Sequence, residues 1–489
     1  MVNAVTILLS IVGLSSVQLH VSGTRVVTPA GSTMRFHGID ICSLEWDAKG
    51  DHIEQSLPVA FDKWGANLIR VPLSEDRWFG KGPDSKGDGT NYRKIVDRLV
   101  SESTRRGKYI LLDLHWSNCG VWGQNIAQHK LPDIGSLAFW KDCAKRYANK
   151  PAVLFDLYNE PIDAPWTVWR NGGPITEQFN GQTLSYQAIG MQTLVEAIRG
   201  VGAKNVIVAG GLGYASRMDG LITNRLVDKS GNGIVYSNHF YPGWESTDSW
   251  EKRMIVATKQ LPVLVGEFGA DPQSLPLDYP KRRAAQVLAV LKKHDWNWCA
   301  WCMHPAASPC LIADWTYKPT PYFGSLVMDA LKGKSVPIPP RLTKIDNKTI
   351  YQDGLKLGYQ SWGSAKVDFQ STTVKRGQRS IQVDANAGQQ VQLGNVPFDG
   401  NPYAGISMYL NGGTAGGQRL VLFANVMDAG QKPVKLPELR AGVWTHVMVT
   451  FRDLGIAGKE NVKSFVLRSA DGSSLPTYYV DEIVLVGKH

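Results

Sequence analysis

The sequence predicts an α/β protein: a (β/α)8 TIM barrel followed by a smaller all-β sandwich of the jelly-roll type. In the first two thirds of the chain, eight short apolar runs alternate with helical stretches. A proline-rich segment interrupts this pattern, and short alternating runs without long helical patterns follow it. The 489 residues are sufficient for two domains, each with its own core.

The barrel prediction depends on the eight runs and on what separates them. Several runs are apolar on both faces, as expected for strands buried in a parallel sheet. Helical patterns lie between them, for example at residues 92–106 and 279–294. Eight such units within about 300 residues match the size of a TIM barrel. The runs are Phe36–Ile41, Ala66–Leu73, Tyr109–Trp116, Val153–Pro161, Asn205–Gly211, Ile234–Tyr241, Pro262–Gly269 and Trp296–Met303.

The domain limits follow from changes in composition. The apolar stretch from Ala4 to Leu14 is shorter than the roughly 20 residues that span a bilayer, and it fits the core of a signal peptide. We therefore expect residues 1–16 to be a signal peptide and the protein to be secreted. No Lys or Arg precedes the stretch, so a buried first strand or a misassigned start codon are the alternatives. The barrel is expected over 17–332, a Pro-rich linker over 333–345 and the sandwich over 346–489.

Charge and cysteine content restrict the partners. The net charge of +10 comes from 53 basic and 43 acidic residues spread along the chain, which does not favour nucleic-acid binding. After the N-terminus no segment is apolar enough for membrane insertion, and we expect a monomer.

Cys299 and Cys302 form a CxxC inside a strand-like run, where alternation places them on opposite faces. A Cys302–Cys310 bridge is one pairing among those the sequence leaves open.

Two glutamates end the fourth and the seventh apolar runs. Glu160 follows Asn159 at the end of run four, and Glu267 lies near the end of run seven. TIM barrels keep their chemistry at the carboxyl ends of the strands, and strands four and seven face each other across the barrel mouth. Glycoside hydrolysis needs two such carboxyl groups, one to donate a proton and one to attack or to activate water. Structural ion pairs are the alternative for either residue alone.

The strand ends together resemble glycoside hydrolase family 5, the cellulase-type barrels. The resemblance extends from about Leu19 to Leu331. It depends on Asn159-Glu160-Pro161 and on Glu267-Phe268-Gly269. The other matching positions are Arg70, His115, His239, Tyr241 and Trp301.

This resemblance implies that Glu160 is the acid/base and Glu267 the nucleophile. Arg70 and Tyr241 would donate hydrogen bonds to Glu267 and keep it ionised. An ordinary barrel salt bridge is the alternative for Arg70. No cofactor is required by this chemistry.

The resemblance also implies which residues contact the sugar. Asn159 would bond the 2-hydroxyl group, and Trp301 would stack on the sugar at the cleavage site. His115 and His239 would contact the sugar or the carboxylates; core histidines and metal ligands are the alternatives, and no metal site is expected.

Strand eight departs from the family pattern. It reads Trp301-Cys-Met-His-Pro305, where family-5 cellulases often carry Trp-Ser-Trp-Asn-Pro, so the second aromatic residue is missing. Other tryptophans near loops could line sugar subsites or pack in the core. They are Trp46, Trp116, Trp122, Trp166, Trp169 and Trp244.

The C-terminal region resembles the β-sandwich modules of secreted bacterial glycosidases. It would be a carbohydrate-binding module using exposed aromatics such as Trp362 or Tyr409, or a structural partner. Asp353 and Asp481 are candidates for a structural Ca²⁺.

The function expected from these observations is a retaining endo-β-glycosidase acting on a plant-type polysaccharide, first of all β-1,4-glucan. A β-mannanase or another β-glycanase is the alternative within the same mechanism, and an exo-β-glucosidase is a further one. A catalytically inactive carbohydrate-binding protein is the alternative from another class.

Overall fold

The computed structural model describes residues 16–118, 120, 126–229, 232–243, 245–270, 278–427 and 429–489. Most of the expected signal peptide, together with Trp122, Trp244 and Cys119, therefore lies outside the described residues. The chain divides into two compact units. The first contains the barrel, and the second, Pro242–Thr247, Ala270–Gln286 and Pro337–His489, contains the sandwich.

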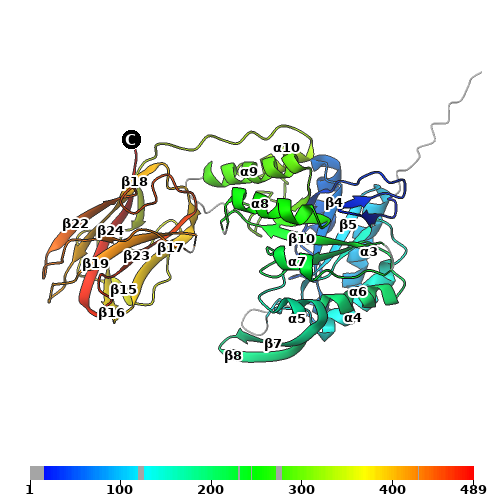
Figure 1. The fold of residues 1–489 in the computed structure, drawn as a ribbon, viewed down its shortest axis with the longest axis horizontal. Coiled ribbons are helices and arrows are strands. Elements are labelled where there is room, and N and C mark those ends of the chain that lie inside the picture. Colours follow the sequence, from blue (N-terminus) through cyan, green and yellow to red (C-terminus); the bar gives the residue numbers. More distant parts are fainter. Residues whose placement is uncertain are drawn as a thin grey trace, which may run out of the picture. The chain divides into compact units, whose positions relative to one another are not determined.

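Eight parallel strands close into a barrel, which confirms the predicted fold class (Figure 1). Each predicted run contains one strand. Their side chains are almost all buried, because helices cover the outside and packed side chains fill the inside. In barrel order the strands are β3 (His37–Asp40), β4 (Leu68–Ser74), β5 (Tyr109–Trp116), β6 (Val153–Asp156), β9 (Ile207–Gly210), β10 (Ile234–Phe240), β11 (Val263–Phe268) and β12 (Asn297–Ala300).

Helices connect these strands. The two expected from apolar spacing are α3 (Thr90–Arg105) and α9 (Asp278–His294). α4 (Ile134–Tyr147) begins at a capping box, in which the Asp133 carboxylate accepts from the Ser136 backbone N–H. The others are α1 (Ile53–Pro58), a π-helix η1 (Val59–Trp64), α2 (Glu75–Trp78), α5 (Trp166–Asn171), α6 (Met191–Gly200), α7 (Asp219–Thr223), α8 (Thr247–Thr258) and α10 (Gly324–Leu331).

An antiparallel hairpin that the sequence analysis missed follows α5. Strands β7 (Gly172–Phe179) and β8 (Gln182–Ile189) pair along their whole length and lie beside α5 at the edge of the barrel unit (Figure 1). Their loop is Asn180-Gly181, and both residues have positive φ. A two-residue Asn-Gly loop is the strongest short-range hairpin signal, so the sequence contained evidence for it. A smaller hairpin, β1 (His20–Ser22) with β2 (Arg25–Val27), precedes the barrel.

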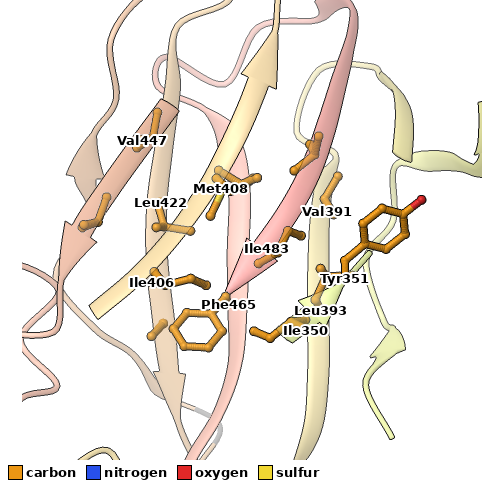
Figure 2. Close-up of a cluster of buried hydrophobic side chains, with 14 of the residues drawn as sticks. Ile350, Tyr351, Val391, Leu393, Ile406, Met408, Leu422, Val447, Phe465 and Ile483 are labelled. Carbon is orange, nitrogen blue, oxygen red and sulfur yellow. The ribbon is translucent and has the colours of Figure 1, made fainter. Parts of the chain in front are cut away.

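The C-terminal unit is a sandwich of two antiparallel sheets. One has the order β15-β16-β24-β18-β22 with β13 added, and the other β14-β17-β23-β19-β20 with β21 added. Alternating apolar residues of both sheets form the core, as Figure 2 shows for Ile406, Met408, Leu422 and Phe465. The strands are β13 (Lys348–Tyr351), β14 (Gln360–Ser361), β15 (Lys366–Ser371), β16 (Ser380–Ala385), β17 (Gln390–Phe398), β18 (Tyr403–Asn411), β19 (Leu420–Val426), β20 (Ala429–Gly430), β21 (Val434–Lys435), β22 (Trp444–Thr450), β23 (Val462–Ser469) and β24 (Leu475–Gly487).

One finer expectation is corrected. Cys302 and Cys310 are both free thiols, and the Cys302 sulfur lies 3.0 Å from that of Cys42 instead. The calcium candidates both bind backbone: Asp353 accepts from the N–H groups of residues 378 and 379, and Asp481 from those of residues 375 and 376. Over the described part of the chain, no helix is long and apolar enough to cross a membrane.

Candidate active site

Arg70 is the centre of the polar network inside the barrel mouth. Its guanidinium is fully buried and donates to Glu267 at 2.7 Å and to Asn159 Oδ1 at 2.8 Å. It also pairs with three further buried carboxylates, at 3.0–3.2 Å. These are Asp40, Asp113 and Asp156. Strand register explains the cluster, because Asp40 lies opposite Arg70 and Asp113 opposite Asp156 in neighbouring strands.

The three aspartates were missed by the sequence analysis. Each is a single acidic residue in an otherwise apolar strand, which is the only signal that could have identified it. Burial raises the pKa of Asp40 well above its usual range and that of Asp156 to about 7, against the opposing effect of Arg70. The three carboxylates hold Arg70 in place.

Glu267 is placed at the end of β11 and is almost completely buried. Arg70 donates to one carboxylate oxygen, and the Tyr241 hydroxyl donates to the other at 2.6 Å. Burial alone would raise the pKa of Glu267, but electrostatic interactions with His239, Arg70 and His115 and the Tyr241 hydrogen bond lower it to about 2. Glu267 is consequently an ionised, fixed carboxylate at neutral pH.

Glu160 follows β6 and is more open to solvent than Glu267. Its side chain is 24% exposed, against 5% for Glu267. His239 Nδ1 lies 2.9 Å from Glu160 Oε1 and 3.6 Å from Glu267 Oε2, so this histidine stands between the two carboxylates. One oxygen of each glutamate and a ring nitrogen of His239 all lie within 4.8 Å of one another. These three side chains could offer three ligands to a metal, but hydrogen bonds already engage them.

The remaining predicted site residues also lie at the barrel mouth. His115 Nδ1 pairs with Asp113 at 2.6 Å, and its Nε2 lies 3.3 Å from the Asn159 amide nitrogen. Burial would lower the pKa of His115, but Asp113, Glu45 and Glu267 together outweigh it and the pKa is raised. The half-buried Trp301 ring is nearly parallel to the His115 ring, with centroids 5.4 Å apart. The structure thus brings all eight expected residues together at the carboxyl ends of the strands.

A ninth side chain, Gln128, reaches the site from the loop between β5 and α4. Asn159 Nδ2 donates to Gln128 Oε1 at 3.1 Å, and Gln128 Nε2 donates to the Glu160 carbonyl at 2.5 Å. No local sequence signal identified this residue, because its role depends on loop folding.

Among the other tryptophans, Trp169 is fully buried and packs in the core. Trp46, Trp116 and Trp166 are half-buried. Among the described members of the set, these three are therefore the ones that are partly exposed.

Comparisons with known proteins agree with this geometry. The family described as Cellulase (glycosyl hydrolase family 5) matches residues 27–307, more than half of the chain. An endoglucanase of Paenibacillus polymyxa is 26% identical over 345 residues, which cover 61% of this chain and 83% of that protein. Endoglucanase E-5 of Thermobifida fusca is 23% identical, over 58% of this chain and 55% of that protein.

Solved structures support the fold. The β-glucanase SdGluc5_26A of Saccharophagus degradans, in complex with cellotetraose, has a TM-score of 0.50 at 20% identity. The alignment covers 65% of this chain and 94% of the β-glucanase.

Proposed function

Because the chain belongs to glycosyl hydrolase family 5 and is thus a glycoside hydrolase, we propose that it cleaves β-1,4-glucan internally by a retaining double displacement. The observation that carries this proposal is the approach of the Glu160 and Glu267 oxygens to within 4.8 Å. Carboxyl groups about 5–5.5 Å apart leave no space for a water molecule between them and the sugar, which is typical of retaining enzymes. Inverting enzymes keep the two groups farther apart.

In the first step Glu267 attacks the anomeric carbon. Its low pKa keeps it ionised, and the hydrogen bonds from Arg70 and Tyr241 hold both oxygens in position. The bond from the anomeric carbon to the leaving oxygen breaks while Glu160 transfers its proton to that oxygen. A covalent glycosyl-enzyme ester on Glu267 results.

In the second step Glu160 acts as a base. Its exposed fraction of 24% lets water reach it, and it takes a proton from the water that attacks the anomeric carbon. Glu267 leaves, and the product has the configuration of the substrate. His239, hydrogen-bonded to Glu160, orients this carboxyl group in both steps.

Asn159 and Trp301 are proposed to bind the sugar at the cleavage site. Asn159 is held by Arg70 and is 4% exposed, so its amide group presents a fixed donor to the 2-hydroxyl. Trp301 offers an aromatic surface to the C–H face of the ring. Relatives named endoglucanases and the cellotetraose complex of a fold neighbour support a β-1,4-glucan as substrate, and secretion would give access to it.

Hydrolysis assays test this proposal. Purified full-length protein is incubated with carboxymethylcellulose, mixed-linkage β-glucan, β-mannan and xylan, with a Glu267→Gln variant as control. We expect the β-1,4-glucans to be cleaved fastest, with viscosity falling well before reducing ends accumulate. Faster cleavage of mannan than of glucan would show that mannan is the preferred substrate. Release of single terminal sugar units would exclude endo action. No hydrolysis of any of the four polysaccharides would contradict the proposal.

For the sandwich, residues 346–489, we propose binding to the polysaccharide. The outward face of the β14-containing sheet supports this role. Strand register places Gln392 beside Val466, and Ser464 beside Asn425. The Ser464 hydroxyl accepts hydrogen bonds from the amides of Gln392 and Asn425, at 3.0 and 2.9 Å.

Aromatic rings flank these amides. The Trp362 ring, 41% exposed, lies against Gly394, where even a Cβ atom would collide with it. Arg468 lies 5.0 Å from the ring centroid of Phe423. The exposed Trp362 ring can stack on a sugar C–H face and the amides can bond hydroxyl groups, so this face is suited to a neutral glycan chain.

Replacement of Trp362 by alanine tests the sandwich proposal. We expect binding of the full chain to insoluble cellulose to weaken about 2- to 10-fold, the value of one aromatic contact. Hydrolysis of soluble glucan should stay unchanged. Trp444→Ala, in the other sheet, is the matched control; equal weakening by both variants, or none by Trp362→Ala, would contradict a binding site on this face.

A further inference from the structure

The hairpin β7–β8 supports the loop that carries Gln128. The Glu177 carboxylate pairs with the His129 ring and accepts from the Lys130 backbone N–H at 3.0 Å. The Tyr186 hydroxyl donates to the Leu131 carbonyl at 2.9 Å and accepts from the Leu131 N–H at 3.0 Å. The segment 129–131 is thus fixed to both strands of the hairpin.

The same segment is also attached to the residues that follow β6. The Tyr158 hydroxyl donates to the His129 carbonyl at 2.8 Å, and the Ile162 N–H donates to the Lys130 carbonyl at 2.9 Å. These two residues flank Asn159 and Glu160 in the chain. Gln128 therefore has a determined position relative to Asn159, although it comes from a different loop.

The contacts of Gln128 determine how the Asn159 amide is oriented. Arg70 occupies Asn159 Oδ1, and one hydrogen of Asn159 Nδ2 is donated to Gln128 Oε1 at 3.1 Å. The second hydrogen is left for the sugar, because the raised pKa of His115 favours a protonated ring, whose Nε2, 3.3 Å from Asn159 Nδ2, cannot accept. Gln128 cannot flip its own amide without losing the bond to the Glu160 carbonyl. Both amides are consequently locked, with Asn159 presenting a donor.

We propose that Gln128, supported by the hairpin, is a positioning residue that aims Asn159 at the C2 hydroxyl of the sugar at the cleavage site. The inference rests on the proposed function. A contact to the 2-hydroxyl strengthens toward the transition state, so its correct aim acts mainly on kcat. Gln128 acts through Asn159 and holds the adjacent Glu160 backbone at the same time.

A comparison of two substrates tests this role. Gln128→Ala is assayed in the full chain with an aryl β-cellobioside and with its analogue that lacks the 2-hydroxyl of the reducing-side glucose. We expect kcat on the normal substrate to fall about 10-fold with little change in KM, equivalent to about 1.4 kcal/mol. On the 2-deoxy substrate the variant and the wild type should differ less than 2-fold, because the contact is already absent (an order-of-magnitude expectation).

Three further variants sharpen the result. Gln178→Ala, a glutamine on the hairpin that bonds Thr183, is the matched control and should leave both rates unchanged. Glu177→Gln should reproduce the Gln128→Ala pattern more weakly. In an Asn159→Ala background, Gln128→Ala should add little.

Equal losses on both substrates would show a general structural role and overturn the inference, as would an unchanged kcat. If the wild type failed to cleave the aryl β-cellobioside at all, the proposed function would fail instead, so the two failures are distinguishable.

Discussion

Glu267→Ala should lower kcat on an aryl β-cellobioside by about 10⁴-fold or more, the scale found when one member of a catalytic unit is removed. The reason is that no other group described in the barrel mouth is an ionised carboxylate close to the site of attack and fixed on both oxygens. The fold should persist, because Arg70 keeps three other carboxylate partners. Steady-state kinetics and circular dichroism measure the two effects.

Added azide separates the roles of the two glutamates. In Glu267→Ala a small anion can enter the space of the lost carboxylate and should yield the α-glycosyl azide. In Glu160→Ala the covalent intermediate still forms from an aryl substrate with a good leaving group, and azide should yield the β-glycosyl azide. Exchanged products would mean exchanged roles, and more than a few per cent residual activity in Glu267→Ala would refute the nucleophile assignment.

Arg70→Met should destabilise the barrel unit by about 3–5 kcal/mol, because it leaves buried carboxylates without their cation. Denaturant unfolding followed by tryptophan fluorescence measures this, since fourteen of the sixteen tryptophans precede residue 333. Arg35→Met is the control. Its partner Asp295 is 63% exposed, and such surface pairs contribute at most about 1 kcal/mol.

The loss of stability caused by Arg70→Met should also depend on pH. Burial raises the pKa of Asp156 to about 7, so the native state retains a proton that the unfolded chain releases from about pH 4. The contribution of Asp156 to the free energy of unfolding therefore falls as the pH rises from about 4 to 7. Loss of Arg70 raises the pKa of Asp156 in the folded state further. The loss of unfolding free energy in the variant, relative to wild type, should therefore be larger at pH 7 than at pH 4.5. A loss that does not vary with pH would contradict this electrostatic account.

The barrel and the position of the two glutamates at its mouth were predictable from the sequence because their signals are local. Apolar runs at regular spacing indicated all eight strands, and Glu160 and Glu267 each lie near the end of such a run. The aspartates around Arg70 were not predictable in the same way. Their partnership depends on register between neighbouring strands, which brings Asp40 beside Arg70 from 30 residues away.

The hairpin and the shortest sandwich strands show a second limit. Asn180-Gly181 carried a clear turn signal, but the surrounding segment was assigned to the connection between two barrel strands. Strands β14, β20 and β21 have two residues each, and pairing with a longer neighbour defines them rather than any pattern of their own. Gln128 was missed for a similar reason, because contacts with the hairpin determine the position of its loop.

The stereochemistry of the first product tests the central claim most directly. Proton NMR of the anomeric signals is recorded during the first minutes of hydrolysis of a β-1,4-linked cello-oligosaccharide, before mutarotation mixes the anomers. The close approach of Glu160 and Glu267 predicts that the β-anomer appears first and the α-anomer only later. Initial appearance of the α-anomer would show inversion and would contradict the assignment of Glu267 as a nucleophile.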